Sequence, residues 1–258
     1  MEITIHNVGH GLCVSLVHEN GNTMLWDCGH QENYRPSKFL PDMGIRRLSR
    51  LFISNYDEDH ISDLPSLLAT YRPGSLHRNK SINADQLRSL KRAGGPITPA
   101  MESMLGMINE YVYGPPDPPP QFPGVSYSVY SNDYGSEFSD TNNISLVTFL
   151  NCNGLVFMIP GDLEEDGWWG LLRDPRFVEE LPKVNILVAP HHGRESGYCA
   201  EAMDLIRPNV VVFSDSEKKH ATQEMTNTYG QYSSGVTFNG APRKVLTTRS
   251  DGSITWRA

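Results

Sequence analysis

Three short segments of this 258-residue chain concentrate side chains that can do chemistry. SNYDEDH (54–60) places three acidic residues and a histidine in one turn, APHHG (189–193) carries two adjacent histidines, and IPGDL (159–163) carries an aspartate. Carboxylates and imidazoles are groups that proteins use to bind Zn²⁺ and Mn²⁺. Their occurrence in three separate turns indicates a metal site assembled from distant parts of the chain.

Each of these segments lies at the end of a predicted buried strand. Residues 51–54, 155–160 and 185–190 are short apolar runs typical of central strands, and apolar residues at helical spacing follow 55–60. In a layered α/β fold, side chains at the carboxyl ends of strands meet in one crevice. Two divalent ions about 3.5–4 Å apart need a bridging carboxylate and ligands from separate loops. The pattern is therefore typical of a dinuclear hydrolase, with Asp162 as the candidate bridge.

Taken alone, each segment has a plainer interpretation. Asp59 could cap the helix expected from Ile61, because an aspartate side chain accepts hydrogen bonds from free helix N–H groups. Asp162 could be an ordinary turn residue. The ring nitrogens of the adjacent His191 and His192 cannot easily all find hydrogen-bond partners in a core, so this pair favours the metal interpretation.

Strands and helices alternate along most of the chain. Residues 1–26 alternate apolar and polar positions as hairpin strands do, and a strand at 210–213 precedes a helix near 220–231. Near the C-terminus, Asp251 and Gly252 lie between two alternating runs, which predicts a terminal hairpin.

Residues 72–125 interrupt this alternation. They contain two expected helices, near 84–92 and 98–112, and then the Pro-rich run GPPDPPPQFPG (114–124). Such a run continues neither a helix nor a central strand. We expect an inserted subdomain or lid at this place.

The composition excludes several classes of protein. Lys and Arg (22) against Asp and Glu (30) leave a formal charge of −8, so no general basic surface exists to collect nucleic acid. Gly (22) and Pro (18) are too frequent for a bundle of long helices. No apolar run approaches the roughly 18 residues of a membrane span, the N-terminus lacks signal-peptide features, and the four cysteines show no CxxC pairing. We expect a cytoplasmic protein with no membrane partner.

Seven motifs occur along the chain in this order: NVGHGLCVSL (7–16), LWDCG (25–29), FISNYDEDHISDL (52–64), TNNISLVTFL with GLVFMIPGDL (141–163), ILVAPHHG (186–193), HATQEMTNTY (220–229) and VLTTRSDGSI (245–254). In order and spacing they resemble the metallo-β-lactamase superfamily and, within it, the hydrolase branch of DNA-uptake competence proteins (ComEC type). The resemblance implies an α/β fold, a four-layer αββα sandwich, formed by residues 1–258 as a single domain. Residues 72–125 are an insertion outside it.

The resemblance also implies two divalent metal ions. One would lie among Asp59, His60, Asp162 and His191, with Asp162 bridging to the other. This mixture of aspartate and histidine ligands suits Zn²⁺ or Mn²⁺.

The other half of the implied site departs from the family. The first two positions of the family's HxHxDH signature fall on Asn55 and Asp57, and a further ligand position falls on Asn142 or Asn143. Asn55 replaces an imidazole with a weak, neutral amide oxygen. This half is rich in oxygen and poor in nitrogen, which makes Mn²⁺ or Mg²⁺ more plausible there.

The function that the resemblance implies is metal-dependent hydrolysis of a phosphodiester, with DNA or a nucleotide as the substrate. Asp59, His192 and His220 are the candidate catalytic residues. His192 could orient a phosphate or water, or could instead lock a neighbouring carboxylate, and His220 could protonate a leaving group or merely cap a helix. The alternatives are hydrolysis of a thioester, lactone or lactam on the same metals, and a degenerate metal-binding regulatory subunit with a protein partner. The oligomeric state is left open.

Overall fold

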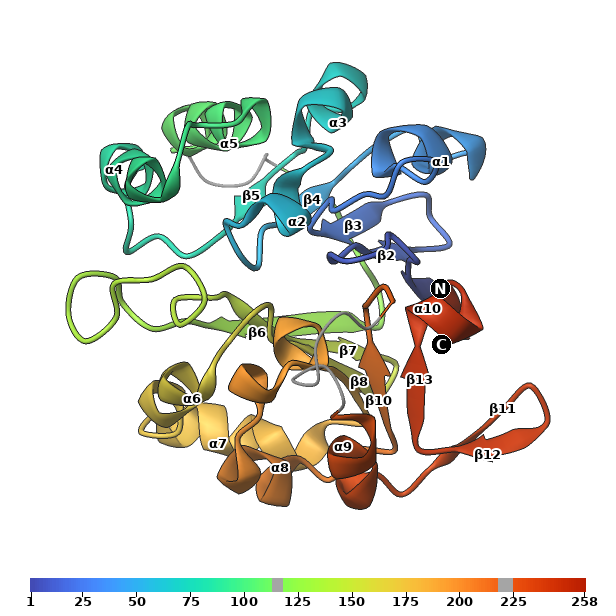
Figure 1. Ribbon diagram of the computed structural model, residues 1–258. Helices are drawn as coiled ribbons and strands as arrows, with labels where there is room; N and C mark the ends of the chain where they lie inside the picture. Colours follow the sequence, from blue (N-terminus) through green and yellow to red (C-terminus); the bar gives the residue numbers. More distant parts are fainter. Residues whose placement is uncertain (113–117, 218–224) are drawn as a thin grey trace.

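The computed structural model describes residues 1–112, 118–217 and 225–258. In the described part of the chain, two β-sheets face each other and helices cover their outer faces (Figure 1). This is the four-layer αββα arrangement that the motifs predicted.

The first sheet is built mainly from the N-terminal part of the chain. Its strands are β1 (Glu2–Ile5), β2 (Val14–Val17), β3 (Thr23–Trp26), β4 (Arg50–Phe52), β5 (Leu76–His77) and β14 (Ile254–Arg257). They lie in the order β14-β1-β2-β3-β4-β5, in which β3, β4 and β5 are parallel and the other pairs are antiparallel.

The second sheet is built from the C-terminal half. Its strands are β6 (Val125–Tyr130), β7 (Val147–Cys152), β8 (Leu155–Ile159), β9 (Ile186–Val188), β10 (Val210–Phe213) and β13 (Val245–Thr247). They lie in the order β13-β10-β9-β8-β7-β6, and β8, β9, β10 and β13 run parallel. The carboxyl ends of β8, β9 and β10 therefore share one edge. A small pair, β11 (Val236–Phe238) and β12 (Ala241–Arg243), projects from the body (Figure 1).

Helices form the two outer layers. The first sheet is covered by α1 (Pro36–Asp42), α3 (Leu64–Thr70), α4 (Ala84–Gly94) and α5 (Pro99–Glu110). The second is covered by α6 (Glu165–Leu171), α7 (Pro175–Glu180), α8 (Ala200–Ile206) and α9 (Thr226–Tyr232). The short helical turn α2 (Glu58–Ile61) lies between β4 and α3, and α10 (Thr248–Asp251) connects β13 to β14. Among the described residues, the helices lack the length and apolar character needed to span a bilayer.

Successive side chains of a strand pack into two different cores, and this holds the layers together. Met24 and Trp26 of β3 point into the core between the sheets, whereas Leu25 points into the core beneath the outer helices. In the second sheet, Phe157 of β8 joins the same central core and Met158 packs under the other helical layer. Because both faces of each sheet are covered, the strands read as continuous apolar runs.

The helices expected near 84–92 and 98–112 are α4 and α5. Asn83 and Gln86 form a capping box at the start of α4, and the Thr98 hydroxyl accepts a hydrogen bond from the Met101 backbone at the start of α5. Leu87 of α4 belongs to the same core cluster as α1 and α3. The two helices are therefore integral to the outer layer.

The terminal hairpin predicted at Asp251 and Gly252 is wrong. β13 pairs with β10 in the second sheet, whereas β14 pairs with β1 in the first, so this segment crosses between the sheets. The Asp251 carboxylate accepts a hydrogen bond from the Thr247 backbone (2.9 Å) and pairs with Arg243 (3.0 Å). Asp251 therefore stabilises the helical turn α10 instead of a hairpin turn.

Candidate metal centre

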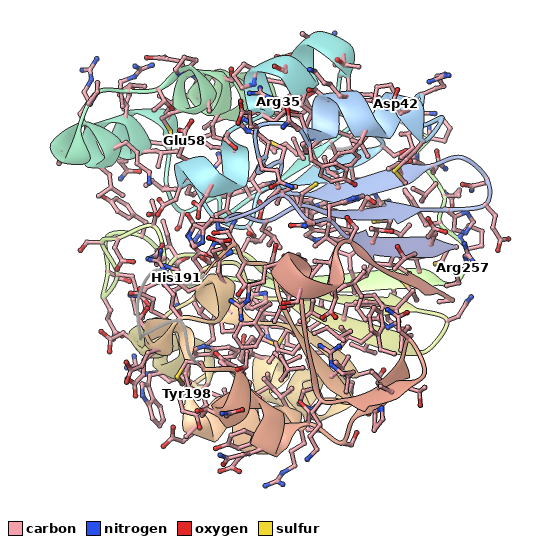
Figure 2. All side chains as sticks on the ribbon, turned by 45° about the vertical axis from the view of Figure 1, so that its right-hand side comes forward. Arg35, Asp42, Glu58, His191, Tyr198 and Arg257 are labelled. Carbon is pink, nitrogen blue, oxygen red and sulfur yellow. The ribbon has the colours of Figure 1, made fainter. Side chains whose placement is uncertain are left out.

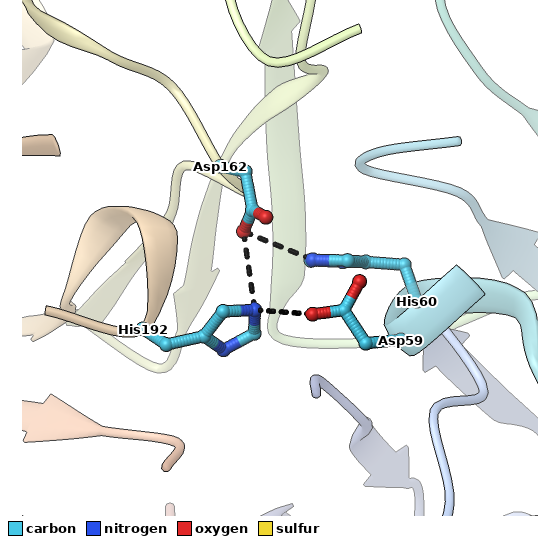
Figure 3. A group of neighbouring side chains, drawn as sticks. All are labelled: Asp59, His60, Asp162 and His192. Carbon is cyan, nitrogen blue, oxygen red and sulfur yellow. Dashed lines mark hydrogen bonds and ion pairs between the residues drawn. The ribbon is translucent and has the colours of Figure 1, made fainter. Parts of the chain in front are cut away.

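Loops from both sheets bring four side chains together. Asp59 and His60 lie on α2 after β4, Asp162 follows β8, and His192 follows β9. One ligand atom from each of the four lies within 4.8 Å of all the others (Figure 3). Figure 2 shows that Glu58, which begins α2, and His191 lie toward the same edge of the sandwich. The strand ends and the loops that follow them therefore hold the acid and histidine cluster.

Backbone contacts fix the turn that carries Asp59 and His60. The backbone N–H of Cys28 donates to the His60 carbonyl (2.8 Å), and that of Leu12 donates to the Asp59 carbonyl (3.3 Å). A Cβ at Gly29 would lie 2.1 Å from the Asp59 carbonyl oxygen, so only glycine permits this approach. The glycine-containing N-terminal loops thus hold α2 in place.

His60 is clamped between two carboxylates. Its Nδ1 donates to Asp27 Oδ2 (2.8 Å), and its Nε2 lies 2.9 Å from Asp162 Oδ1. Asp27 directly follows β3 with a left-handed φ of 56° and is buried. Its other oxygen accepts a hydrogen bond from the Ser54 backbone (2.7 Å). Asp27 therefore fixes the His60 ring with Nε2 facing the centre.

His192 presents an unpartnered nitrogen to the same place. Its Nδ1 donates to the Ser214 carbonyl (2.8 Å), which leaves Nε2 facing Asp59 Oδ2 (3.1 Å) and Asp162 Oδ1 (3.4 Å) (Figure 3). In the described part of the chain, this buried Nε2 makes no hydrogen bond. A lone pair aimed at two carboxylates is repelled unless a cation or a proton lies between them.

The histidine turn adopts an unusual backbone. His191 and His192 both have left-handed conformations, with φ values of 49° and 55°. Gly193 follows at φ 76°, and a Cβ there would lie 1.9 Å from the ring of Phe213. Such strain in bulky residues persists only where surrounding packing enforces it. This turn aims the two imidazoles in different directions.

Negative charge dominates the electrostatics of the centre. Burial alone would lower the pKa of His60, but Asp162 and Asp27 raise it well above its usual value. Burial would likewise lower the pKa of His192, but Asp162 raises it above its usual value. Burial would raise the pKa of Asp162, but His60 and His192 bring it down to about 2. The centre attracts positive charge, either protons on the imidazoles or a divalent ion.

The donor set fits a divalent metal ion. Two carboxylates and two imidazole nitrogens converge, and each histidine has its other nitrogen held by a protein acceptor, as in protein metal sites. Ligands about 2.0–2.3 Å from one ion lie roughly 3–3.7 Å from each other. The contacts of 2.9, 3.1 and 3.4 Å among the four side chains are close to that range.

His191 lies at the edge of this group. Its Nε2 is 3.9 Å from Asp162 Oδ2 and accepts a hydrogen bond from Arg194 (3.2 Å). Its Nδ1 lies 3.0 Å from both Ser196 Oγ and Glu164 Oε1. Both histidines therefore lie near Asp162, but His192, rather than His191, belongs to the group of four.

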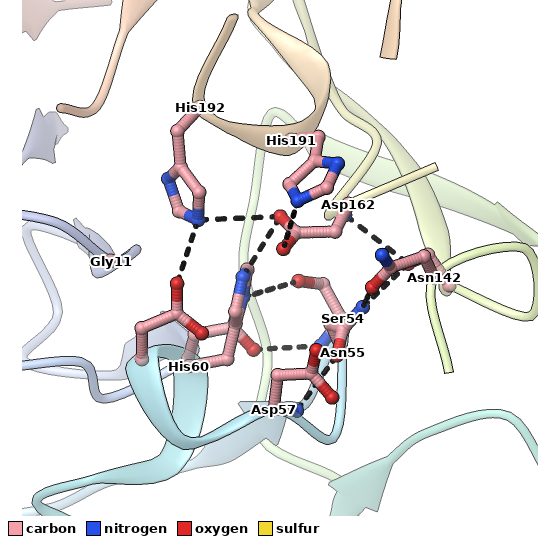
Figure 4. A network of polar contacts seen from close by, with 12 residues as sticks. Gly11, Ser54, Asn55, Asp57, His60, Asn142, Asp162, His191 and His192 are labelled. Atoms are coloured by element: carbon pink, nitrogen blue, oxygen red, sulfur yellow. Dashed lines mark hydrogen bonds and ion pairs between the residues drawn. The ribbon is translucent and has the colours of Figure 1, made fainter. Parts of the chain in front are cut away.

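Asn55 and Asp57 lie outside the group of four (Figure 4). The Asn55 amide nitrogen lies 3.1 Å from Asn142 Oδ1, and the Asn55 amide oxygen accepts a hydrogen bond from the Asp57 backbone (2.7 Å). Asp57 pairs with Lys91. Asn143 is directed elsewhere, since its Oδ1 accepts from the Gly167 backbone (2.8 Å).

His220 lies outside the described residues. The sequence reasoning missed Asp27, although it occupies the same position after a strand as the predicted ligands do. It also assigned no role to His10 and Arg194. The Arg194 guanidinium donates to His10 Nε2 (3.2 Å), and that nitrogen lies 3.5 Å from Asp59 Oδ2.

Solved structures identify the fold. YhfI from Bacillus subtilis, a metallo-β-lactamase fold protein, superposes with a TM-score of 0.54 at 11% identity over 100% of both chains. CmlA from Streptomyces venezuelae, a diiron β-hydroxylase, gives a TM-score of 0.54 at 12% identity over 99% of this chain and 54% of its own. The chain therefore has the metallo-β-lactamase fold, with a candidate divalent metal site at the position described above. Because a hydroxylase shares this fold, the fold alone does not define the reaction.

Comparison with curated sequences shows which branch of the superfamily the chain resembles. The chain is 22% identical over 232 residues to ComE operon protein 3 of Bacillus subtilis (strain 168), across 85% of this chain and 26% of that protein. The chain thus spans about a quarter of the length of the curated relative that it matches. The resemblance to the ComEC-type branch, predicted from the motifs, is confirmed. No family model matches the chain.

Proposed function

We propose that this protein is a metal-dependent phosphodiesterase in which Asp59, His60, Asp162 and His192 hold a Zn²⁺ or Mn²⁺ ion. A bound divalent ion supplies Lewis-acid stabilisation of phosphoryl charge and activates water near neutral pH. The donor set of the centre supports this proposal, and so does the resemblance to metallohydrolases.

The protein's own residues prepare the site for that chemistry. Asp27 and the Ser214 carbonyl each hold a histidine Nδ1–H, so that the Nε2 atoms of His60 and His192 are available to the ion. Asp162 contacts both histidines at the middle of the group. Rings held by hydrogen bonds and packing keep the geometry that catalysis requires.

The position of the Arg194 guanidinium beside the centre is the observation that favours an anionic substrate. Its guanidinium donates to His191 Nε2 and His10 Nε2, both at 3.2 Å, so these two nitrogens are unprotonated acceptors. Burial, with a further contribution from His192, lowers the pKa of His10 to about 4, and burial also lowers the pKa of His191. The positive charge of Arg194 is therefore held beside the centre between neutral rings. A guanidinium matches phosphate oxygens, whereas a neutral thioester, lactone or lactam does not need it.

The substrate would be a nucleotide or DNA, as in the ComEC-type resemblance. The net charge of −8 gives no general attraction for DNA, so phosphate recognition falls on local groups such as Arg194. His220 remains a proposal as the donor of a proton to the leaving oxygen. A cytoplasmic location, a protein partner and the domain assignment of 72–125 likewise remain predictions.

The test compares substrates on metal-loaded protein. We expect turnover of bis(p-nitrophenyl) phosphate and no turnover of nitrocefin or a thioester. Arg194→Met should raise KM for the phosphodiester about tenfold or more, since a charge-assisted contact to phosphate contributes about 1.5–3 kcal/mol. Arg173→Met is the matched control, because Arg173 is exposed and pairs with Glu137.

Two results would contradict the proposal. Turnover of nitrocefin or the thioester without turnover of the phosphodiester would favour the alternative substrate class. A tightly bound ion without turnover of either substrate would favour a metal-binding regulatory subunit.

A further inference from the structure

The side chains of the Asn55 half of the predicted dinuclear site are engaged in contacts within the protein. Asn55 is buried, and its amide nitrogen faces the Thr141 carbonyl (3.3 Å), Asn142 Oδ1 (3.1 Å) and Ser145 Oγ (3.2 Å). Its amide oxygen accepts the Asp57 backbone N–H (2.7 Å). The side chain therefore links two loops, and both its amide nitrogen and its amide oxygen already have hydrogen-bond partners.

A cation of the protein itself already contacts Asp57. Lys91 Nζ forms an ion pair with Asp57 Oδ1 and lies 3.3 Å from Thr141 Oγ1. The Thr141 hydroxyl donates to the same Asp57 oxygen (2.7 Å). The side chains of Lys91 and Asp57 are 23% and 35% exposed, so the pair is partly shielded from solvent. An ammonium at this carboxylate neutralises it and repels a divalent ion.

The packing of helix α4 places Lys91 beside Asp57. Its capping box at Asn83 fixes its start, and Leu87 is buried one turn before Lys91. The helix packs on α5, which packs on α2. The start of α2 is tied to α5 by a hydrogen bond from Thr98 Oγ1 to Glu58 Oε2 (2.7 Å). The segment that delivers Lys91 is therefore anchored to the turn that carries the metal-site residues.

We infer that the centre is mononuclear and that the Lys91 ammonium, supplied by helix α4, occupies the place of a second metal ion at Asp57. This inference rests on the proposed metal centre. It assigns helix α4 a role, which is to supply the positive charge at the second site. It also replaces the dinuclear centre that the sequence pattern predicted.

The test measures metal stoichiometry rather than activity. Metal-free protein is dialysed against Mn²⁺, and bound metal is determined by elemental analysis, with electron paramagnetic resonance to detect coupled Mn²⁺ pairs. We expect one ion per chain in the wild type and in Asp57→Asn, because Asp57 is not a ligand. The double variant Lys91→Ala with Asn55→His removes the ammonium and adds an imidazole, and it should bind two ions and show the coupled signal.

Arg88→Ala is the matched control, since it removes a cation from the same helix that pairs with Glu102 rather than Asp57. It should keep one ion. Circular dichroism establishes that each variant is folded. A second ion in the wild type that Asp57→Asn removes would overturn the inference and leave the proposed function standing. A folded double variant that still binds one ion would overturn the role of Lys91. No ion in the wild type would instead contradict the proposed metal centre.

Discussion

Substituting Asp27 by asparagine tests how the protein prepares His60 for a metal ion. Asp27 Oδ1 accepts the Ser54 backbone N–H, and Oδ2 accepts His60 Nδ1–H (2.8 Å). Asparagine has nearly the same shape and tolerates the left-handed φ of 56°. It can keep the bond from the Ser54 backbone, while its amide NH₂ replaces Oδ2, which in the wild type also accepts from the Ser54 hydroxyl. The His60 Nδ1 must then accept a hydrogen bond, and the ring proton moves to Nε2, where it blocks coordination.

The expected loss is large enough to measure directly. Removing the partner of a metal-bound histidine typically lowers metal affinity 10–100-fold, which corresponds to about 1.4–2.7 kcal/mol. Because the wrong tautomer is favoured in Asp27→Asn, we expect the upper end of this range. Competition for Zn²⁺ against a chromophoric chelator measures the affinity, and circular dichroism monitors folding.

Asp63→Asn is the matched control for Asp27→Asn. Asp63 is equally buried, and its Oδ2 accepts the Ser37 backbone N–H (2.7 Å) away from the centre. This control should keep wild-type affinity. Unchanged Zn²⁺ affinity in a folded Asp27→Asn protein would refute the view that Asp27 sets the His60 tautomer.

Two further predictions concern stability. Gly193→Ala should lower the free energy of unfolding by at least about 2 kcal/mol, because φ is +76° and the new Cβ would clash with the Phe213 ring. Gly240 has a φ of +79° but open space around the position of a Cβ, so Gly240→Ala should lower the free energy of unfolding by only about 1 kcal/mol. Urea titration measures both changes. Burial lowers the pKa of His6 from 6.5 to about 3, so only the unfolded chain binds this proton between those values and stability falls as the pH drops below 6.5. At pH 5 this loss is about 2 kcal/mol relative to pH 7. Urea titrations at pH 7 and pH 5 should show that the free energy of unfolding of His6→Gln falls by about 2 kcal/mol less than that of the wild type.

Each of these predictions has a contradicting result. Equal destabilisation by the two glycine variants would mean that contact with Phe213 does not constrain the histidine turn. A His6→Gln protein as acid-sensitive as the wild type would show that His6 is not the neutral, buried group that its bonds to Ser15 (2.8 Å) and Tyr34 (3.0 Å) indicate.

The sequence could predict the layered fold and the elements that bring the centre together. Strand, helix and turn patterns are local, and the parallel strands β8 and β9 necessarily direct Asp162 and the histidine pair to one edge. Which histidine faces the centre depends on the left-handed backbone of His191 and His192. Left-handed φ values in bulky residues follow from tertiary packing, so no residue pattern indicates them.

Two other features depend on long-range structure. Lys91 reaches Asp57 from a helix 34 residues further along the chain, and no local pattern indicates this contact. The turn at Asp251 and Gly252 has local hairpin chemistry, but pairing with different sheets overrides it. Local propensity is a weak guide where strand pairing decides the chain path.

The metal content of wild-type protein and of Asp162→Ala tests the central claim most directly. Asp162 Oδ1 lies 2.9 Å from His60 Nε2 and 3.4 Å from His192 Nε2, so its carboxylate joins the ligands from both sheets. Elemental analysis after dialysis against Zn²⁺ and then metal-free buffer should find one ion per chain in the wild type. It should find almost none in Asp162→Ala that remains folded by circular dichroism. Equal metal content in the two proteins, or no metal in either, would contradict a metal centre at these residues.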